Sequence, residues 1–329
     1  MRLSVWCLLV VAGLAGCRSA PSNSTGGGNS SGGSKELQIA VIPKGATHEY
    51  WKSIHAGAQR AADELKGIQI LWKGPLKEDD REDQIKVVED FATKKVDGIV
   101  LAPLDDAALS NPTNDAINAG IPVVIIDSGL KNVKAVSYVA TDNYKAGQLG
   151  GQKLVALLNG KGKVLMLRYE VGSASTDARE RGFIDAVKSA PRIVVVSSDQ
   201  FGGATTETAQ KASENLLARF SGQVDGIFTP NESTTFGMMR ALENANLAGK
   251  VKFVGFDASS ALVQGLKKGE INGLVVQNPE KMGYLGVKTL VDSIQGKAVQ
   301  DKIDTGATVV DASNMNNPDV AKLLAPPEI

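Results

Sequence analysis

The chain has 329 residues, and its 36 lysines and arginines balance its 36 aspartates and glutamates, so the formal net charge is zero. A neutral chain offers no basic field to attract nucleic acid. Its only two cysteines are Cys7 and Cys17, at the very start. The rest of the chain therefore has neither a disulfide nor a thiolate metal site nor a cysteine nucleophile.

The first 17 residues predict a lipoprotein signal peptide. Arg2 is followed by an apolar run at residues 3–11 that is too short to span a bilayer. Leu14-Ala15-Gly16-Cys17 then resembles the bacterial lipobox, in which the cysteine is diacylated and becomes the mature N-terminus. We expect lipidation at Cys17 and an extracytoplasmic protein held to a bacterial membrane, in the periplasm or on the cell surface, by this lipid alone.

Residues 18–34 are rich in serine and glycine and have no apolar periodicity. Such a segment cannot bury a core and acts as a flexible tether. About 295 residues follow it, enough for two lobes of ordinary domain size.

Strands and helices are expected to alternate from residue 37 onward. The continuous apolar run at 37–42 is typical of a parallel strand that is covered on both faces. In chain order, the next expected elements are a helix at 47–66, a strand at 68–72, a helix at 79–95, strands at 98–102, 122–127 and 135–139, and a helix at 142–158.

The second half repeats this order. It is expected to contain strands at 163–169, 193–197, 226–229 and 251–257 with helices between them, the first at 175–189. The tail adds a strand at 274–277, a helix at 279–295 and a strand at 308–310. Regular alternation of this kind predicts an α/β fold with a doubly wound, parallel sheet in each of two lobes.

An internal repeat supports two lobes of common ancestry. Val96-Asp97-Gly98-Ile99 recurs as Val224-Asp225-Gly226-Ile227, and each copy leads to a second apolar strand that ends in an acid. These acids are Asp127 and Asp257. Ligands of open parallel sheets bind at the carboxyl ends of the strands, so we expect both carboxylates to face one cleft between the lobes.

Aromatic and cationic residues also follow strands. Tyr50 and Trp51 are neighbours at a helix start and point about 100° apart, so at least one should face the cleft. Arg179 and Arg181 begin the corresponding helix of the second lobe, where one can enter the cleft while the other stays solvated.

Two motifs carry a family resemblance. Ala178-Arg179-Glu180-Arg181-Gly182 is similar to the Ala-Arg-Glu-Arg-Gly of ribose-binding proteins, and Val254-Gly255-Phe256-Asp257 to their Val-Gly-Phe-Asp. From residue 37 to about residue 310, the chain resembles a type I periplasmic substrate-binding protein of the ribose-, galactose- and xylose-binding family, which serves ABC sugar importers. The resemblance implies that a monosaccharide or related polyol is captured between the lobes and delivered to an ABC permease and its ATPase.

The resemblance also implies a ligand-binding set drawn from both lobes. Its members are His48, Tyr50, Trp51, Asp127, Ser128, Arg179, Phe201, Asn231, Asp257 and Gln277. Two of them depart from ribose binders, which have an arginine at the position of Ser128 and an asparagine at that of His48. We expect Arg179 and Asp257, exposed to cleft water, to meet adjacent hydroxyls of the ligand; the alternative is an ion pair between them.

Three crossovers between the lobes follow from the resemblance, near Thr141, near residues 277–278 and around residues 303–306, and they would form a multi-strand hinge. The expected first lobe comprises residues 37–141 and 278–305, and the second comprises residues 142–277 and 306–329. A monomer without cofactor or metal is expected.

An enzyme is disfavoured by the motifs. Residues 43–47 contain a single glycine and lack the dinucleotide-binding fingerprint, and the two histidines, His48 and His55, have no carboxylate at zinc-like spacing. A repressor of the same fold would need an N-terminal helix-turn-helix in place of the lipobox. A receptor that signals a sugar or autoinducer to a membrane sensor kinase stays open as an alternative.

Overall fold

The computed structural model describes residues 36–325, and the two similar α/β lobes expected from the sequence are confirmed within them. The signal peptide with Cys17 and the tether at 18–34 lie outside the described residues. Within the described range, no helix combines the length and the apolar character that a membrane crossing requires.

The first sheet contains six parallel strands in the order β11-β5-β4-β3-β1-β2. The strands are β1 (Leu37–Ile42), β2 (Ile68–Trp72), β3 (Gly98–Leu101), β4 (Val123–Ile126), β5 (Ser137–Ala140) and β11 (Lys302–Asp304). Its helices are α1 (Glu49–Leu65), α2 (Arg81–Lys94), α3 (Ser110–Asn118) and α9 (Pro279–Ile294).

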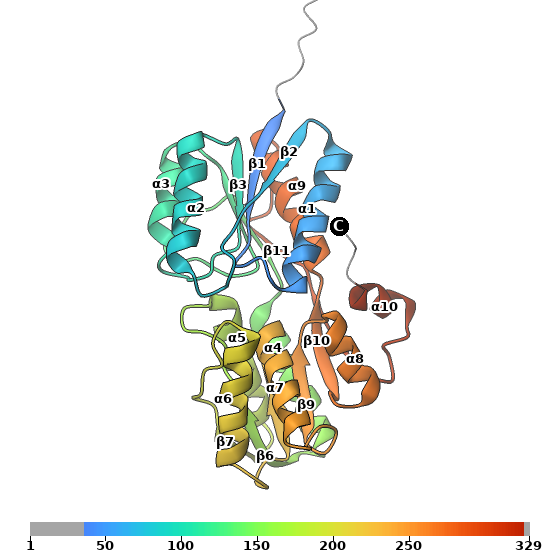
Figure 1. Ribbon diagram of the computed structural model, residues 1–329. Helices are drawn as coiled ribbons and strands as arrows, with labels where there is room; N and C mark the ends of the chain where they lie inside the picture. Colours follow the sequence, from blue (N-terminus) through green and yellow to red (C-terminus); the bar gives the residue numbers. More distant parts are fainter. Residues whose placement is uncertain (1–35, 326–329) are drawn as a thin grey trace, which may run out of the picture. The chain divides into compact units, whose positions relative to one another are not determined.

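Alternation along the strands explains why both faces are covered. Ile39 and Val41 pack on the face under α1 and α9, while Ala40 and Ile42 pack on the face under α2 and α3. Figure 1 shows these two helix layers on either side of the strands. The apolar run at 37–42 is therefore buried on both sides.

The second sheet has the order β12-β10-β9-β8-β6-β7. Each of its strands has a counterpart at the same place in the first sheet. The strands are β6 (Lys161–Met166), β7 (Arg192–Ser197), β8 (Gly226–Phe228), β9 (Lys252–Phe256), β10 (Gly273–Gln277) and β12 (Ala307–Val310). Its helices are α4 (Asn143–Leu157), α5 (Ala174–Lys188), α6 (Thr206–Arg219), α7 (Glu232–Asn244), α8 (Ser260–Lys268) and α10 (Pro318–Leu324).

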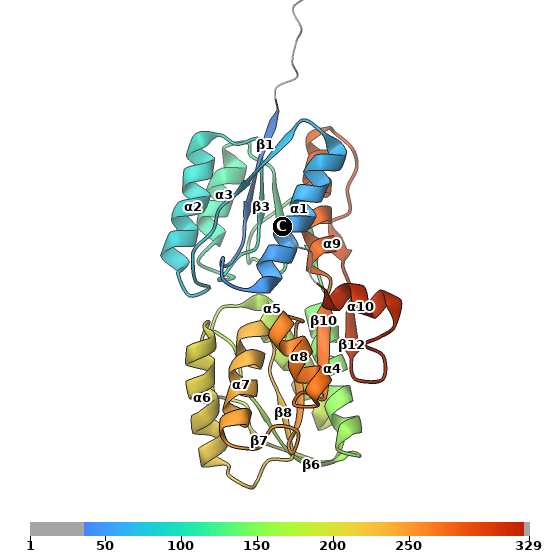
Figure 2. The same ribbon diagram turned by 45° about the vertical axis from the view of Figure 1, so that its right-hand side comes forward.

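One edge differs between the sheets. β12 runs antiparallel to β10, whereas β11 runs parallel to β5. An antiparallel edge strand on an otherwise parallel sheet is common. No helix was expected from the sequence at the C-terminal residues that form α10, which lies beside β10 and β12 in Figure 2.

The chain passes between the sheets three times. It leaves the first sheet after β5 at Ala140, returns between β10 and α9, and leaves again between β11 and β12. Thr141 lies in the first of these connections and Gly306 in the third. The Thr141 hydroxyl donates to the Gly306 carbonyl at 3.2 Å. The first and third connections therefore run side by side.

Candidate functional site

In each lobe, an aspartate in the left-handed backbone conformation follows a central strand. Asp127 follows β4 with φ of 62°, and Asp257 follows β9 with φ of 70°. Aspartate tolerates this left-handed conformation better than most residues. The N–H of Asp127 bonds to Val139 of β5, and that of Asp257 bonds to Val275 of β10, so each acid is tied to the next strand of its sheet.

A polar cavity lies where the strand ends of the two sheets meet. The lining residues are Lys44, His48, Tyr50, Trp51, Glu78, Asp127, Tyr169, Ser175, Thr176, Arg179, Asn231, Glu232, Asp257 and Gln277.

Eight of the ten residues expected to bind ligand therefore line one cavity. The other two do not. Ser128 is fully buried, and its Oγ accepts a bond from the Ser175 N–H at 3.0 Å. Phe201 lies against the Arg168 guanidinium, 4.4 Å from the ring centre, and is absent from the lining.

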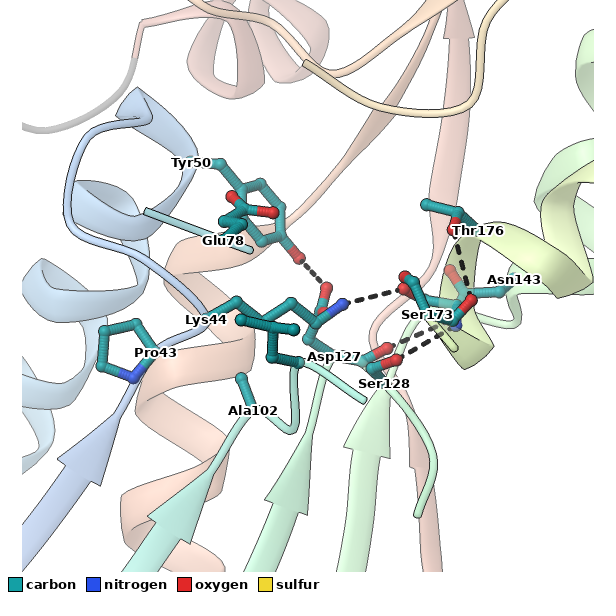
Figure 3. Close-up of polar contacts among 12 residues, drawn as sticks. Pro43, Lys44, Tyr50, Glu78, Ala102, Asp127, Ser128, Asn143, Ser173 and Thr176 are labelled. Carbon is teal, nitrogen blue, oxygen red and sulfur yellow. Dashed lines mark hydrogen bonds and ion pairs between the residues drawn. The ribbon is translucent and has the colours of Figure 1, made fainter. Parts of the chain in front are cut away.

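Asp127 forms an ion pair with Lys44 in the first lobe. Its Oδ1 accepts the Tyr50 hydroxyl at 2.9 Å, and its Oδ2 lies 2.7 Å from the Lys44 Nζ. Figure 3 shows Tyr50 and Lys44 converging on this carboxylate. Lys44 also donates to the Ser175 Oγ at 3.1 Å, so the same ammonium contacts both lobes.

Asp257 has neutral partners instead. Gln277 Nε2 donates to its Oδ1 at 2.8 Å, and the Glu232 backbone N–H donates to its Oδ2 at 2.9 Å. Burial raises the pKa of the Asp257 carboxyl, although the positive charge of Arg179 and the Gln277 bond oppose the shift.

Arg179 is held firmly, and only 2% of it is exposed. Its Nε donates to Asn143 Oδ1 at 2.8 Å, its Nη1 donates to the Pro230 carbonyl at 2.9 Å, and its guanidinium lies over the Phe256 ring. Its Nη2 is buried and has no hydrogen-bond partner within the described residues. Arg179 and Asp257 form no ion pair in this part of the chain, so Nη2 is a donor available to a ligand in the cavity.

Close helix packing sets the place of Arg179. A side chain at Gly147 of α4 would put its Cβ 1.9 Å from the Arg179 carbonyl oxygen of α5. Only glycine allows this approach of the two backbones. The short distance between α4 and α5 brings the guanidinium to the cavity.

Glu78 lines the same cavity and also joins the two lobes. It accepts bonds from His48 Nδ1 and Trp51 Nε1 of its own lobe, and from the Tyr169 hydroxyl of the second lobe at 2.6 Å. Burial alone would raise the pKa of Glu78, but the charge and hydrogen bond of His48 lower it to about 2. Burial opposes the shift of His48, and Glu78 nevertheless raises the pKa of His48 to about 9.

Trp51 combines packing with a place in the lining. It is 3% exposed and belongs to the apolar core under α1 and α9, while its ring stands edge-on to Tyr50 at 5.0 Å. Both adjacent aromatics line the cavity.

Several lining residues were not among those expected from the sequence. Lys44 and Tyr169 could have been found because each follows a strand, and Glu232 because it adjoins Asn231. Glu78 lies in a polar loop beside Lys77, Asp79 and Asp80, and no pattern distinguishes the one acid that turns inward.

Comparison with known proteins places the chain in a family. The model of the periplasmic binding protein domain family matches residues 39–298. The chain therefore belongs to the periplasmic binding protein family.

Individual relatives are similar over most of their length. A ribose import binding protein of Haemophilus influenzae is 29% identical over 85% of this chain and 94% of its own. A solute-binding protein of Agrobacterium radiobacter, solved with D-arabinose, is 31% identical with a TM-score of 0.85 over 88% of this chain and 99% of its own. One from Agrobacterium vitis, solved with D-fucose, is 34% identical with a TM-score of 0.84 over 88% of this chain and 100% of its own.

Proposed function

We propose that this protein is the extracytoplasmic solute-binding lipoprotein of an ABC importer and that it clasps a monosaccharide or related polyol between its lobes. The similar proteins include a ribose import binding protein and solute-binding proteins solved with D-arabinose and D-fucose. The family, the two lobes and the polar cavity between them support this proposal together.

The unpartnered Nη2 of Arg179 is the observation that carries it. This donor is buried beside a cavity that also contains carboxylates from both lobes, Asp127 and Asp257. A sugar hydroxyl both donates and accepts, so neighbouring hydroxyls can satisfy the arginine and a carboxylate at once. A ligand that can only accept hydrogen bonds, such as a simple anion, could not donate one to the carboxylates of Asp127 and Asp257.

Aromatic groups supply the other half of sugar recognition. The Tyr50 and Trp51 rings line the cavity beside the polar groups and offer apolar surface to the C–H groups of a sugar ring. Charge-assisted hydrogen bonds contribute roughly 1.5–3 kcal/mol each, so a few of them support a dissociation constant near ~1 μM.

Closure about the three crossovers is the proposed mechanism. We assign residues 37–141 and 278–305 to the first lobe and residues 142–277 and 306–329 to the second, with the crossovers as the hinge. Ligand bonds to both lobes favour the closed form. The closed form then docks on the permease, while a lipid on Cys17 holds the protein at the membrane.

A sugar panel tests the binding role. The purified protein is screened by thermal shift with D-ribose, D-allose, D-arabinose, D-fucose and xylitol, and the hits are titrated by calorimetry. Arg179→Ala should weaken binding tenfold or more because a charge-assisted bond is lost. Arg181→Ala, on the same helix but exposed, should stay within about twofold. Failure of every sugar and polyol to bind the wild type would refute the proposal.

Lipidation is tested separately. Cys17→Ser should leave an uncleaved precursor that incorporates no labelled fatty acid. A variant that is processed and held at the membrane like the wild type would show that Cys17 is not the lipid site.

A further inference from the structure

Three helices begin at the cleft with an N-cap residue whose side chain makes no capping hydrogen bond. The first N–H groups of a helix have no partner within the helix, and a side chain at the N-cap position commonly satisfies one of them. The N-cap residues of α1, α5 and α8 are His48, Ser173 and Ser259, and none makes a side-chain cap bond. Five other helices are capped locally, by Asp80, Asp142, Thr205, Asn231 and Asn278.

The missing caps of α1 come from the opposite lobe. Glu232 begins α7 in the second lobe, and its carboxylate accepts the backbone N–H of Glu49 at 3.3 Å and that of Tyr50 at 3.1 Å. These are the first two N–H groups of α1, in the first lobe. A carboxylate at this end of a helix also interacts favourably with the helix dipole.

The arrangement is reciprocal. Glu49, the first residue of α1, accepts both the backbone N–H and the hydroxyl of Ser260 with its Oε2, each at 2.9 Å. Ser260 is the first residue of α8 in the second lobe. In addition, Ser128 of the first lobe accepts the Ser175 N–H in the first turn of α5.

Each of these bonds joins one lobe to the other, so each exists only while the lobes are closed. Opening returns the N–H groups and the carboxylates to water. The bonds therefore contribute to the free-energy difference between the closed and open forms, and that difference enters the apparent affinity for any ligand that needs the closed form.

We propose that Glu49 and Glu232 form a reciprocal helix-capping latch that stabilises the closed form and slows ligand release. The consequence for affinity rests on the proposed sugar-binding function. The capping itself does not, because it involves protein groups alone. Both glutamates act as positioning residues: their hydrogen bonds hold the two lobes against each other in the closed form.

Glu49 is the cleaner of the two to test. Glu232 lines the ligand cavity and could touch the ligand directly, whereas Glu49 does not line that cavity. Glu49 is also half-buried rather than part of the core, so its removal should not prevent folding.

The experiment compares Glu49→Ala, Glu49→Gln and Glu280→Ala with the wild type. Glu280 is a matched control, because it is an acid in the first turn of α9 that pairs with Arg60 of its own lobe at 3.2 Å. Two quantities are measured: the dissociation rate and affinity of the best sugar from the panel above, and hydrogen exchange at the Ser260 amide with and without sugar.

Glu49→Ala should weaken sugar binding about tenfold, equal to about 1.4 kcal/mol, mainly through faster dissociation. Exchange at the Ser260 amide should be faster by a similar factor. Glu49→Gln keeps an acceptor oxygen and should recover most of both effects. Glu280→Ala should remain within about twofold in both.

Unchanged exchange at Ser260 in Glu49→Ala would overturn the latch, as would an equal effect of Glu280→Ala. Weaker binding with unchanged exchange would mean that Glu49 contacts the ligand, which also overturns it. If no sugar binds the wild type, the proposed function fails, while the Ser260 exchange rates in the sugar-free protein still decide the latch.

Discussion

Asp127 and Asp257 occupy matching places in the two lobes but have different electrostatic surroundings. Both follow a central strand in a left-handed conformation, and both donate their N–H to the next strand. Asp127 is paired with the Lys44 ammonium, whereas Asp257 is held by the Gln277 amide and a backbone N–H. The shared backbone sets where an acid points, and non-equivalent neighbours set how its charge is compensated.

The largest effect is expected from removing the cation of the first lobe. Lys44→Met leaves Asp127 buried without its counter-charge and should cost about 3 kcal/mol of unfolding free energy. Gln277→Met, the counterpart in the second lobe, should cost less, about 1.5 kcal/mol, because it removes a hydrogen bond to Asp257 but no counter-charge. Urea unfolding measures both.

The double variant Lys44→Met with Asp127→Asn is the control for this comparison. It should regain much of the loss, since no unpaired charge remains. Equal costs for Lys44→Met and Gln277→Met would remove the electrostatic distinction between the two acids.

Arg179 should contribute to stability as well as to binding. The sequence predicted an arginine exposed to cleft water, but the side chain is buried and bonded to Asn143 and Pro230. Arg179→Ala should therefore cost about 2 kcal/mol in the sugar-free protein. A loss below about 0.5 kcal/mol in a denaturant titration would contradict the buried geometry.

Each lobe also carries a partly buried group with a raised pKa. Burial and the nearby Asp257 charge raise the pKa of Glu232 to about 7, against the opposing charge of His48. Glu78 raises the pKa of His48 to about 9, although burial opposes this. A group with a raised folded-state pKa contributes stability at low pH and loses it as the pH rises through that value.

Stability should accordingly fall in two stages. The Glu232 contribution is lost between about pH 4.5 and 7, and the His48 contribution between about pH 6.5 and 9, at about 1.4 kcal/mol per pKa unit before solvent screening. Glu232→Gln should flatten the first stage and leave most of the second, because Glu78 contributes more than Glu232 to the raised pKa of His48. Urea unfolding at several pH values between 5 and 9 checks this, and an unchanged slope below pH 7 would exclude Glu232 as its source.

The smallest effects concern the aromatics. Trp51→Phe keeps an aromatic ring but loses the bond to Glu78 and should weaken sugar binding by about 1 kcal/mol. Phe201→Leu, in the second lobe, should change the affinity less than twofold because its ring does not line the cavity. Calorimetry distinguishes the two, and a larger effect of Phe201→Leu would mean that this aromatic reaches the ligand.

The fold was predictable because its signals are local. The apolar runs at 37–42 and 274–277 and the repeated tetrapeptide mark strands without any knowledge of tertiary contacts. Asp127 and Asp257 could be placed at one site because strand ends converge in a parallel sheet.

The remaining parts of the candidate site depend on tertiary contacts. Glu78 enters the cavity because Tyr169, 91 residues later, meets it across the cleft. Phe201 stands away from the cavity because its ring packs with Arg168. The sequence also could not show that a helix of one lobe is capped by a residue of the other. Glu49 and Ser260, which form such a contact, are 211 residues apart.

The crossovers described above have a consequence for biosynthesis. β11 pairs Lys302 with Tyr138 and Ile303 with Val139, so the sheet that begins with Leu37 gains its last strand from residues 302–304. α9, which covers one face of that sheet, also comes after the whole central part of the second sheet. A nascent chain halted before residue 279 would lack both elements. The first lobe should therefore reach its native form only after nearly the entire polypeptide has been synthesised, and contacts so distant in sequence favour slow folding. A chain that stays unfolded for long after its N-terminus emerges is well suited to export before it folds.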